Sequence, residues 1–467
     1  MTVVTPVTRV TGHAAAGDPG EQPRWIAELL RDGYEAYRRH VNPLVTQRAE
    51  LLGEPTHVTH VRDGQLVEPR GSVEDFHGTQ AFGHRHPAIT AAVAEFLASD
   101  SPNWFPCRVN PYAGALAKRL CERANAATPA TPVYSNVFFA NSGSGAVEAA
   151  IKLARAATRR PRVLSLDGAY HGCTMGSCAL MKPGMFKDPF GPHVPGLEPI
   201  PFGDDVGRSI DALVRALRGG DVAAVVVEPI QLEGGVRSVP DAFLEVACAA
   251  TAAHGTLLVA DEIQTGLGRT GRFLASERWP RRPDAVILGK HLGGGLVPIS
   301  AMMTSEALFE RAYGEHYASA EAHNTTFGGS ALVCVAALAA LELLSDELIA
   351  EVGVRGARLR GRLAAALDRH ALFDQVRGDG MLVGIALRPS DHPWLSFEHF
   401  GVPALADQPT IGVLLCHRLY RRGFYCFACG HDWRILRVLP RFTIPEPTLD
   451  AFVAAIDEEL EVLCSLT

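Results

Sequence analysis

The sequence predicts an α/β fold in which a mainly parallel, doubly wound sheet carries helices on both faces. Between about residues 110 and 340, short β-branched runs alternate with polar or glycine-rich turns and Ala/Leu-rich helical stretches, the order of βαβ units. The β-branched runs are almost wholly apolar, as strands buried on both faces are. With 467 residues, 47% of them hydrophobic, the chain can form more than one domain.

Five runs are predicted to be strands of this sheet, and each leads into polar or glycine residues. They are NVFFA (136–140), RVLSL (162–166), VAAVVVEPI (222–230), GTLLVADEI (255–263) and DAVILG (284–289). Because open parallel sheets bind ligands at the carboxyl ends of their strands, the residues that follow these runs are candidates for a binding site.

The segments on either side of this region are more mixed and predict a second, smaller α+β domain. A helical stretch over 346–369, a strand-like MLVGIAL and a proline-containing loop over 388–410 lie in the C-terminal part. We therefore expect four regions along the chain. They are a flexible N-terminal arm over 1–25, the N-terminal part of the small domain over 26–90, a large domain over 91–344 that contains the parallel sheet, and the rest of the small domain over 345–467.

Charge and hydropathy predict a cytoplasmic protein without nucleic-acid or membrane partners. The formal net charge is −7, so the chain has no basic footprint for nucleic acid. It also has no apolar run of the roughly 18 residues that a membrane helix needs, and its first residues lack the apolar region of a signal peptide.

The ten cysteines are scattered without a framework, which in a chain of this length indicates reduced thiols. Cys426, Cys429 and His431 have a metal-like spacing in CFACGH, but no second CxxC completes a tetrahedral site. We expect incidental thiols and no metal here, with zinc or redox chemistry as the alternative.

Lys290 follows a buried strand and shortly precedes three glycines, in VILGKHLGGG. A lysine at such a strand end can be a phosphate-binding charge or an amine that forms a Schiff base. It can also be a lysine that only reaches out to solvent. The residue alone does not decide among the three.

A glycine-rich turn, NSGSG, follows the first strand and leads into a helix, and free amides at a helix N-terminus bind phosphate. Gly143 and Gly145 nearly match the dinucleotide fingerprint, with Asp167 about 20 residues further on. A Rossmann dehydrogenase is therefore an alternative, although it leaves Asp261 and Lys290 unexplained.

Two carboxylates, Asp261 and Glu228, close buried strands, and each needs a cation or a strong donor. A pyridinium nitrogen would satisfy Asp261. The phosphate-binding turn, Asp261, an aromatic at Tyr170 and the amine of Lys290 are together the groups that pyridoxal 5'-phosphate needs.

Six stretches of the sequence carry a resemblance to a known family. The stretches FFANSGSGAVEAAIKLAR, LDGAYHGCTMG, VVVEPIQLEGG, LLVADEIQTGLGRTGRF, DAVILGKHLGGGLVPISA and HNTTFGGS resemble, in order and spacing, the class III aminotransferases of pyridoxal-phosphate fold type I. This group contains the ornithine and 4-aminobutyrate aminotransferases. The resemblance covers about 70–455, including FGHRHPAI in its N-terminal part.

The resemblance implies three catalytic residues. Lys290 would hold the cofactor as an internal aldimine and move a proton as general acid and base. Asp261 would pair with the protonated ring nitrogen, and Tyr170 would stack on one face of the ring.

The resemblance also implies the remaining cofactor contacts, and hence a homodimer with shared active sites. Ile263 would press on the other ring face, and Gln264 would approach the 3' oxygen. The full cofactor set would be Gly143, Ser144, Tyr170, Glu228, Asp261, Ile263, Gln264, Lys290 and Thr326, where Gly143 and Ser144 bind the phosphate through their amides and Thr326 joins them from the partner subunit.

The residues that would bind substrate depart in part from the family pattern. Arg437 matches the arginine that binds a substrate carboxylate, and Glu233 matches the glutamate that pairs with it and swings away for the second substrate. Leu232 replaces the usual glycine before that glutamate. Cys173 stands where glutamate-using relatives commonly have an arginine for the distal carboxylate.

The sequence thus predicts a dimeric, pyridoxal-phosphate-dependent aminotransferase that moves an amino group from an amine or amino acid to an oxo acid. A racemase, decarboxylase or lyase with the same cofactor is the nearest alternative, because the cofactor chemistry fixes only which bonds can be labilised. A dehydrogenase and a catalytically dead binding or scaffold protein are the more distant ones.

Overall fold

A computed structural model describes residues 77–105, 108–128, 132–315, 322–390 and 409–466, together with short pieces at 33, 36–43, 45, 60–62, 65–67, 130, 392 and 395. The expected arm over 1–25 and most of the expected loop over 388–410 lie outside these residues. The chain divides into two compact units, Met1–His60 with Val67–Pro69, and Val61–Leu66 with Arg70–Thr467. The short strands β1 (His60–Arg62) and β2 (Gln65–Val67) pair with each other. The other described strands, and the helices listed below, belong to the second unit.

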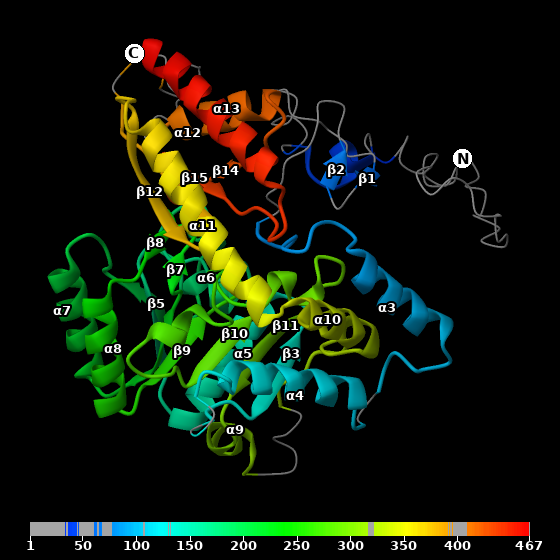
Figure 1. Cartoon of the computed structure of the whole chain (residues 1–467). Coiled ribbons are helices and arrows are strands. Elements are labelled where there is room, and N and C mark those ends of the chain that lie inside the picture. Colours follow the sequence, from blue (N-terminus) through cyan, green and yellow to red (C-terminus); the bar gives the residue numbers. More distant parts are fainter. Residues whose placement is uncertain are drawn as a thin grey trace, which may run out of the picture. The chain divides into compact units, whose positions relative to one another are not determined.

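A seven-stranded sheet forms the centre of the second unit and confirms the predicted fold class (Figure 1). Its strands run in the order β3 (Asn136–Ala140), β11 (Ser300–Thr304), β10 (Ala285–Leu288), β9 (Leu257–Asp261), β6 (Val222–Val227), β4 (Arg162–Leu166) and β5 (Leu197–Ile200). The pairs from β10 to β5 are parallel, and β11 is antiparallel to both of its neighbours.

The five predicted strands all form, whereas β5 and β11 were not predicted from the sequence. Neither run has the β-branched composition on which the prediction depended: β5 reads LEPI and β11 reads SAMMT. The predicted strand over 222–230 is interrupted after Val227, and a separate strand β7 (Ile230–Gln231) pairs with β8 (Arg237–Ser238).

Helices cover both faces of the sheet because alternate residues of each strand point to opposite sides. On β9, Leu257 and Val259 belong to the core cluster that contains the apolar face of α5 (Gly143–Thr158). Leu258 and Ala260 belong to the cluster on the other side. The remaining helices around this sheet are α3 (Pro87–Ala98), α4 (Pro111–Asn125), α6 (Met175–Ala179), α7 (Val206–Leu217), α8 (Asp241–Ala253), α9 (Glu306–Tyr313) and α10 (Ala331–Leu343), with short 3-10 turns η1 (Asp188–Phe190), η2 (Ala275–Arg278) and η3 (Lys290–Gly293).

The C-terminal part forms a four-stranded antiparallel sheet packed with three helices (Figure 1). Its strands run in the order β12 (Phe373–Asp379), β13 (Leu382–Leu387), β15 (Ile435–Val438) and β14 (Phe427–Ala428), and its helices are α11 (Asp346–Leu367), α12 (Ile411–Arg421) and α13 (Glu446–Ser465). The predicted helix over 346–369 and strand MLVGIAL correspond to α11 and β13.

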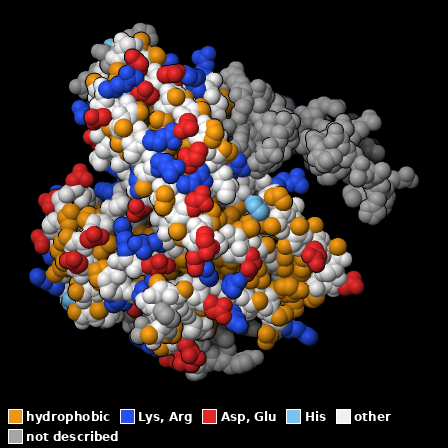
Figure 2. Space-filling view, in the orientation of Figure 1, with side chains coloured by type: hydrophobic (Ala, Val, Ile, Leu, Met, Phe, Trp, Pro, Cys, Tyr) orange, Lys and Arg blue, Asp and Glu red, His pale blue; other side chains and the backbone are white. Residues whose placement is uncertain are grey.

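The surface seen in Figure 2 mixes acidic and basic side chains, with no large area of a single sign. Ion pairs such as Arg369–Asp457 (2.9 Å) and Arg162–Glu198 (2.7 Å) illustrate the mixing. In the part of the chain that is described, no helix is both long and apolar enough to cross a membrane.

Candidate active site

Lys290 and Asp261 stand at the carboxyl ends of two neighbouring parallel strands, β10 and β9. Ile287 of β10 pairs in register with Asp261, so Lys290 lies three residues beyond that pair. Burial lowers the pKa of the Lys290 ammonium, and the nearby carboxylates of Asp261 and Glu233 only partly offset this effect. Lys290 also has a left-handed backbone with φ of +50°, a conformation that is costly for a non-glycine residue and is concentrated at functional sites.

Asp261 is buried and accepts hydrogen bonds at both carboxylate oxygens. His171 Nδ1 donates to Oδ2 (2.7 Å), and the Ile263 amide donates to Oδ1 (3.1 Å). Burial opposes a charge on His171, but its hydrogen bond to Asp261 and the nearby carboxylates raise the pKa of its imidazole. The sequence analysis did not single out His171, although it stands beside Tyr170 at a predicted strand end.

Glu228 follows β6 and holds the turn that carries Tyr170 and His171. Its Oε1 accepts a hydrogen bond from the Tyr170 amide (2.8 Å). Burial raises the pKa of Glu228 to about 8, against the opposing charge of His171 and the Tyr170 amide. The carboxyl group is therefore protonated near neutral pH.

The glycine-rich turn after β3 becomes the first turn of α5, as predicted. Ser142 caps this helix by accepting from the Gly145 amide (3.1 Å). The amides of Gly143 and Ser144 lie in the first helical turn, where backbone donors have no acceptor within the helix. Ser144 Oγ accepts from the Cys173 amide (3.1 Å), which ties this turn to the one after β4.

Ile263 and Gln264 follow Asp261 and line the same end of the sheet. A Cβ on Gly143 would lie 2.8 Å from Ile263 Cδ1, so the glycine permits this close packing. Gln264 is 5% exposed, and among the described residues neither its Oε1 nor its Nε2 has a hydrogen-bond partner. A buried side-chain amide of this kind implies a polar partner that is not among the described residues.

Tyr170 contacts both Cys173 and Phe186. The Tyr170 hydroxyl lies 3.1 Å from Cys173 Sγ, and the Tyr170 ring meets Phe186 edge-on at 5.7 Å. Burial, together with the contact to Cys173, raises the pKa of the Tyr170 phenol, which is therefore neutral.

Arg437 on β15 is 3% exposed and is paired with Glu233, which lies between β7 and β8. The contact joins Arg437 Nη1 to Glu233 Oε1, and the second oxygen of Glu233 accepts from the Gly430 amide (2.6 Å). On its other side, Arg437 Nη2 donates to His77 Nδ1 (2.6 Å). His77 is a second residue that the sequence analysis missed, because no local pattern marks it.

Thr326 is exposed in the single chain. Its carbonyl accepts from Trp104 Nε1 (2.9 Å). The cysteines of CFACGH are free thiols: Cys429 is buried, and Cys426 Sγ lies 3.8 Å from Cys416 Sγ. Among the described residues, no group of three or more His, Cys, Asp or Glu is placed to hold a metal ion.

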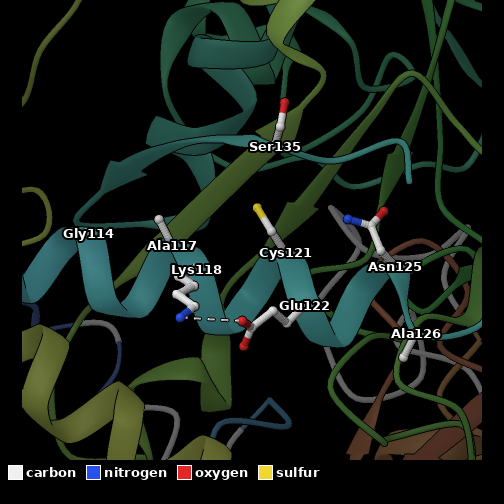
Figure 3. Close-up of a pocket in the computed structure, with 8 residues that line it drawn as sticks. All are labelled: Gly114, Ala117, Lys118, Cys121, Glu122, Asn125, Ala126 and Ser135. Carbon is white, nitrogen blue, oxygen red and sulfur yellow. Dashed lines mark ion pairs between the residues drawn. The ribbon is translucent and has the colours of Figure 1, made fainter. Parts of the chain in front are cut away.

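A separate hollow of about 640 Å³ runs along α4 and carries no comparable chemistry (Figure 3). It is lined mainly by α4 residues and Ser135, and its charged side chains, Lys118 and Glu122, form an ion pair with each other at 3.8 Å. The residues expected to act are therefore gathered at the sheet edge and not in this hollow.

Known proteins resemble this chain over most of its length. The family model of class III aminotransferases matches residues 76–460. A putrescine aminotransferase from Pectobacterium atrosepticum is 34% identical over 459 residues, which covers 95% of this chain and 91% of the relative. The ornithine aminotransferase structure from Toxoplasma gondii has a TM-score of 0.77 and 26% identity, covering 94% of this chain and 98% of that one.

Two further structures contain the cofactor. A second structure of the Toxoplasma gondii enzyme, with pyridoxal phosphate partly occupying its active site, has a TM-score of 0.75 and 26% identity, covering 93% of this chain and 97% of that one. A taurine:2-oxoglutarate aminotransferase from Bifidobacterium kashiwanohense, in complex with pyridoxal phosphate and glutamate, shares the fold with a TM-score of 0.74 and 22% identity, covering 87% and 93%.

The chain belongs to the class III aminotransferases, which depend on pyridoxal phosphate. It is a transaminase that moves an amino group between an amine or amino acid and an oxo acid. The residues present fit the cofactor, because the described part of the chain brings together a half-buried lysine with a lowered pKa, a buried carboxylate held by His171, the amides of a helix N-terminus and a buried Gln264 amide without partners among the described residues.

Proposed function

We propose that this enzyme takes its amino group from a primary amine with no carboxylate beside the reacting nitrogen, such as a diamine, and passes it to an oxo acid. The observation that carries the proposal is the Glu233–Arg437 pair, closed by the Gly430 amide. A donor carboxylate has to compete with Glu233 for the arginine, whereas an apolar or cationic tail does not. The 34% identical relative is named for putrescine, a diamine.

We assign the acceptor specificity to Arg437 and Cys173. Once Glu233 moves away, the guanidinium offers a fork to the carboxylate of any oxo acid. Cys173 supplies only a weak S–H donor for a second carboxylate. A missing charge-assisted bond costs about 1.5–3 kcal/mol, roughly a ten- to hundredfold loss of affinity, so 2-oxoglutarate gains little over pyruvate.

Pyridoxal phosphate, when bound, supplies an aldehyde that condenses with amines and a ring that withdraws electrons. In our assignment Lys290 carries it covalently and moves the proton at the reacting carbon of the substrate, for which its lowered pKa suits it. Asp261, fixed by His171, holds the proton on the ring nitrogen.

The other assigned residues hold the cofactor in place. The Gly143 and Ser144 amides would bind its phosphate, Gln264 would donate to its 3' oxygen, and Tyr170 and Ile263 would pack against the ring. Glu228 supports this arrangement through the Tyr170 amide.

We also propose a cytoplasmic homodimer in which Thr326 completes the phosphate site of the partner subunit. The domain division at residues 90 and 344 belongs to the same proposal. Trp104 and Phe327, which are 51% and 56% exposed near Thr326, support an interface there, because exposed large apolar side chains mark association surfaces.

The proposal is tested on the purified holoenzyme. Borohydride reduction and peptide mapping should find the cofactor on Lys290. Absorbance then follows each half-reaction separately. Putrescine should convert the bound aldehyde at least roughly tenfold faster than glutamate does, and pyruvate and 2-oxoglutarate should restore it at rates within roughly tenfold of each other.

Cys173→Arg serves as the matched variant and should shift the acceptor preference toward 2-oxoglutarate. A preference of wild type for 2-oxoglutarate of roughly a hundredfold or more would show that another residue reads the distal carboxylate. Faster reaction with glutamate than with putrescine would overturn the donor class.

A further inference from the structure

Arg437 is held by more than its ion pair with Glu233. Its Nη2 donates to His77 Nδ1 at 2.6 Å, and its guanidinium lies 5.8 Å from the centroid of the Phe427 ring. The His77 ring stacks on the same Phe427 ring at 5.5 Å, with 17° between the two planes. The stacked rings of His77 and Phe427 thus both contact the Arg437 guanidinium.

The hydrogen bond defines the protonation state of His77. A guanidinium can only donate, so Nδ1 accepts through its lone pair and the proton of the neutral imidazole lies on Nε2. Burial and the charge of Arg437 lower the pKa of His77 to about 4, with Lys290 acting in the same direction and Glu233 against it. His77 is therefore neutral near neutral pH.

The backbone keeps the imidazole in this place. His77 has φ of +53°, in the left-handed region where, besides glycine, Asn, Asp and His are enriched. The next residue, Gly78, also has a positive φ (+77°), and a Cβ there would lie 2.4 Å from Gln264 Nε2. The turn that carries His77 is thus packed against the site.

We propose that His77 is a positioning residue that orients the Arg437 guanidinium for the carboxylate of the oxo acid after Glu233 has moved away. The inference rests on the proposed function and adds a residue to it. Glu233 must leave Arg437 for a carboxylate to enter, whereas the contacts with His77 and Phe427 can remain. A bidentate carboxylate requires one orientation of the guanidinium plane, and those two contacts define it.

The choice of a neutral acceptor has a chemical reason. A carboxylate at position 77 would also orient the arginine, but it would cancel the charge that attracts the substrate. An imidazole that accepts one hydrogen bond orients the guanidinium and leaves its charge available. The nature of the side chain at position 77, and not only its presence, should therefore determine affinity for oxo acids.

Three variants separate these effects. His77→Asn keeps an acceptor and tolerates the left-handed backbone, His77→Leu removes the acceptor, and His77→Asp adds a charge. In the holoenzyme, KM for pyruvate should stay within roughly threefold in the Asn variant, rise roughly tenfold in the Leu variant and rise further in the Asp variant. The half-reaction with putrescine, which needs no carboxylate site, should change by less than roughly twofold in the Asn and Leu variants.

Arg159→Leu is the matched control for stability, because it also places a leucine on a left-handed backbone (φ +58°), at the exposed C-terminal end of α5. Equal loss in both half-reactions of His77→Leu, with a Tm well below that of Arg159→Leu, would mean a structural role and overturn the proposal. Unchanged KM for pyruvate in His77→Leu would overturn it as well.

A binding measurement decides the question without turnover. In a Glu233→Gln background, which removes the charge that competes for Arg437, titration calorimetry should show that His77→Leu weakens propionate binding roughly tenfold and that His77→Asn does not. If wild type fails to react with any oxo acid, the proposed function is wrong, and the propionate series still tests His77. Equal propionate affinity in all variants would refute the inference.

Discussion

At the scale of single residues, the site depends on charges that are buried and then paired. Asp261 is matched by His171 (2.7 Å), whereas Glu228 has the backbone amide of Tyr170 as its partner (2.8 Å). An unpaired buried carboxylate takes up a proton instead of remaining charged. The two carboxyl groups at neighbouring strand ends therefore have different partners, an imidazole for Asp261 and a backbone amide for Glu228, whose pKa is raised by burial.

This difference predicts a pH dependence for Glu228→Gln in the apoprotein. The folded pKa of about 8 lies above the ordinary value of 4.5, so between these values the unfolded chain releases the proton while the folded chain keeps it. The stability contributed by Glu228 is thus present below about pH 4.5 and is lost as the pH rises toward 8. Glutamine stays neutral and can still accept from the Tyr170 amide.

The Tm of Glu228→Gln minus the Tm of wild type should therefore increase from pH 5 to pH 8, as measured by thermal unfolding. A difference in Tm that is constant over this range would mean that Glu228 is ionised in the folded protein.

At the scale of elements, two turns at the edge of the sheet interlock. Gly172, in the turn after β4, has φ of +119°, and a Cβ there would lie 2.0 Å from Ser144 Oγ and 3.0 Å from Ser144 Cα in α5. Gly172→Ala should lower Tm and weaken pyridoxal phosphate binding, because it pushes the first turn of α5 out of place. Backbone strain of this kind costs about 1–3 kcal/mol before any clash is added.

Gly184→Ala is the matched control for this prediction. Gly184 also has a positive φ (+146°), but a Cβ there would meet no atom within 4 Å. It should lose stability through strain alone and bind pyridoxal phosphate like wild type in a fluorescence titration. The interlock is refuted if both variants bind the cofactor equally well.

At the scale of the whole molecule, the proposed dimer predicts complementation between two defective subunits. Lys290→Ala removes the lysine of its own site, and Thr326→Ala removes the threonine lent to the partner's site. A mixed dimer keeps one of its two sites intact, and a one-to-one mixture that exchanges freely contains about half mixed dimers. The mixture should therefore reach about a quarter of the wild-type activity per dimer and exceed either parent. Absence of recovery, with subunit exchange shown by differently tagged chains, would place Thr326 in its own subunit's site or in no site.

The sequence by itself determined the sheet-forming runs and the residues that follow them. Apolar runs such as VAAVVV and DAVILG must be buried, and Asp261, Glu228 and Lys290 stand next to such runs in the chain, so their place at the strand ends follows from the order of residues. β11 lacks that local signal: its SAMMT run becomes a strand because it pairs with β10 and β3, which is a tertiary effect on a weak propensity.

Only the tertiary structure decided which side chains meet. His171 and Asp261 are 90 residues apart in the chain, and His77 and Arg437 are 360 apart. No periodicity or spacing encodes a contact over such distances, because it arises from how strand ends and turns converge on one edge of the sheet. Composition and pattern therefore defined the class of chemistry, whereas the hydrogen-bond partners of Asp261 and Arg437 became visible only in the folded chain, since hydrogen bonds depend on distances that the sequence does not contain.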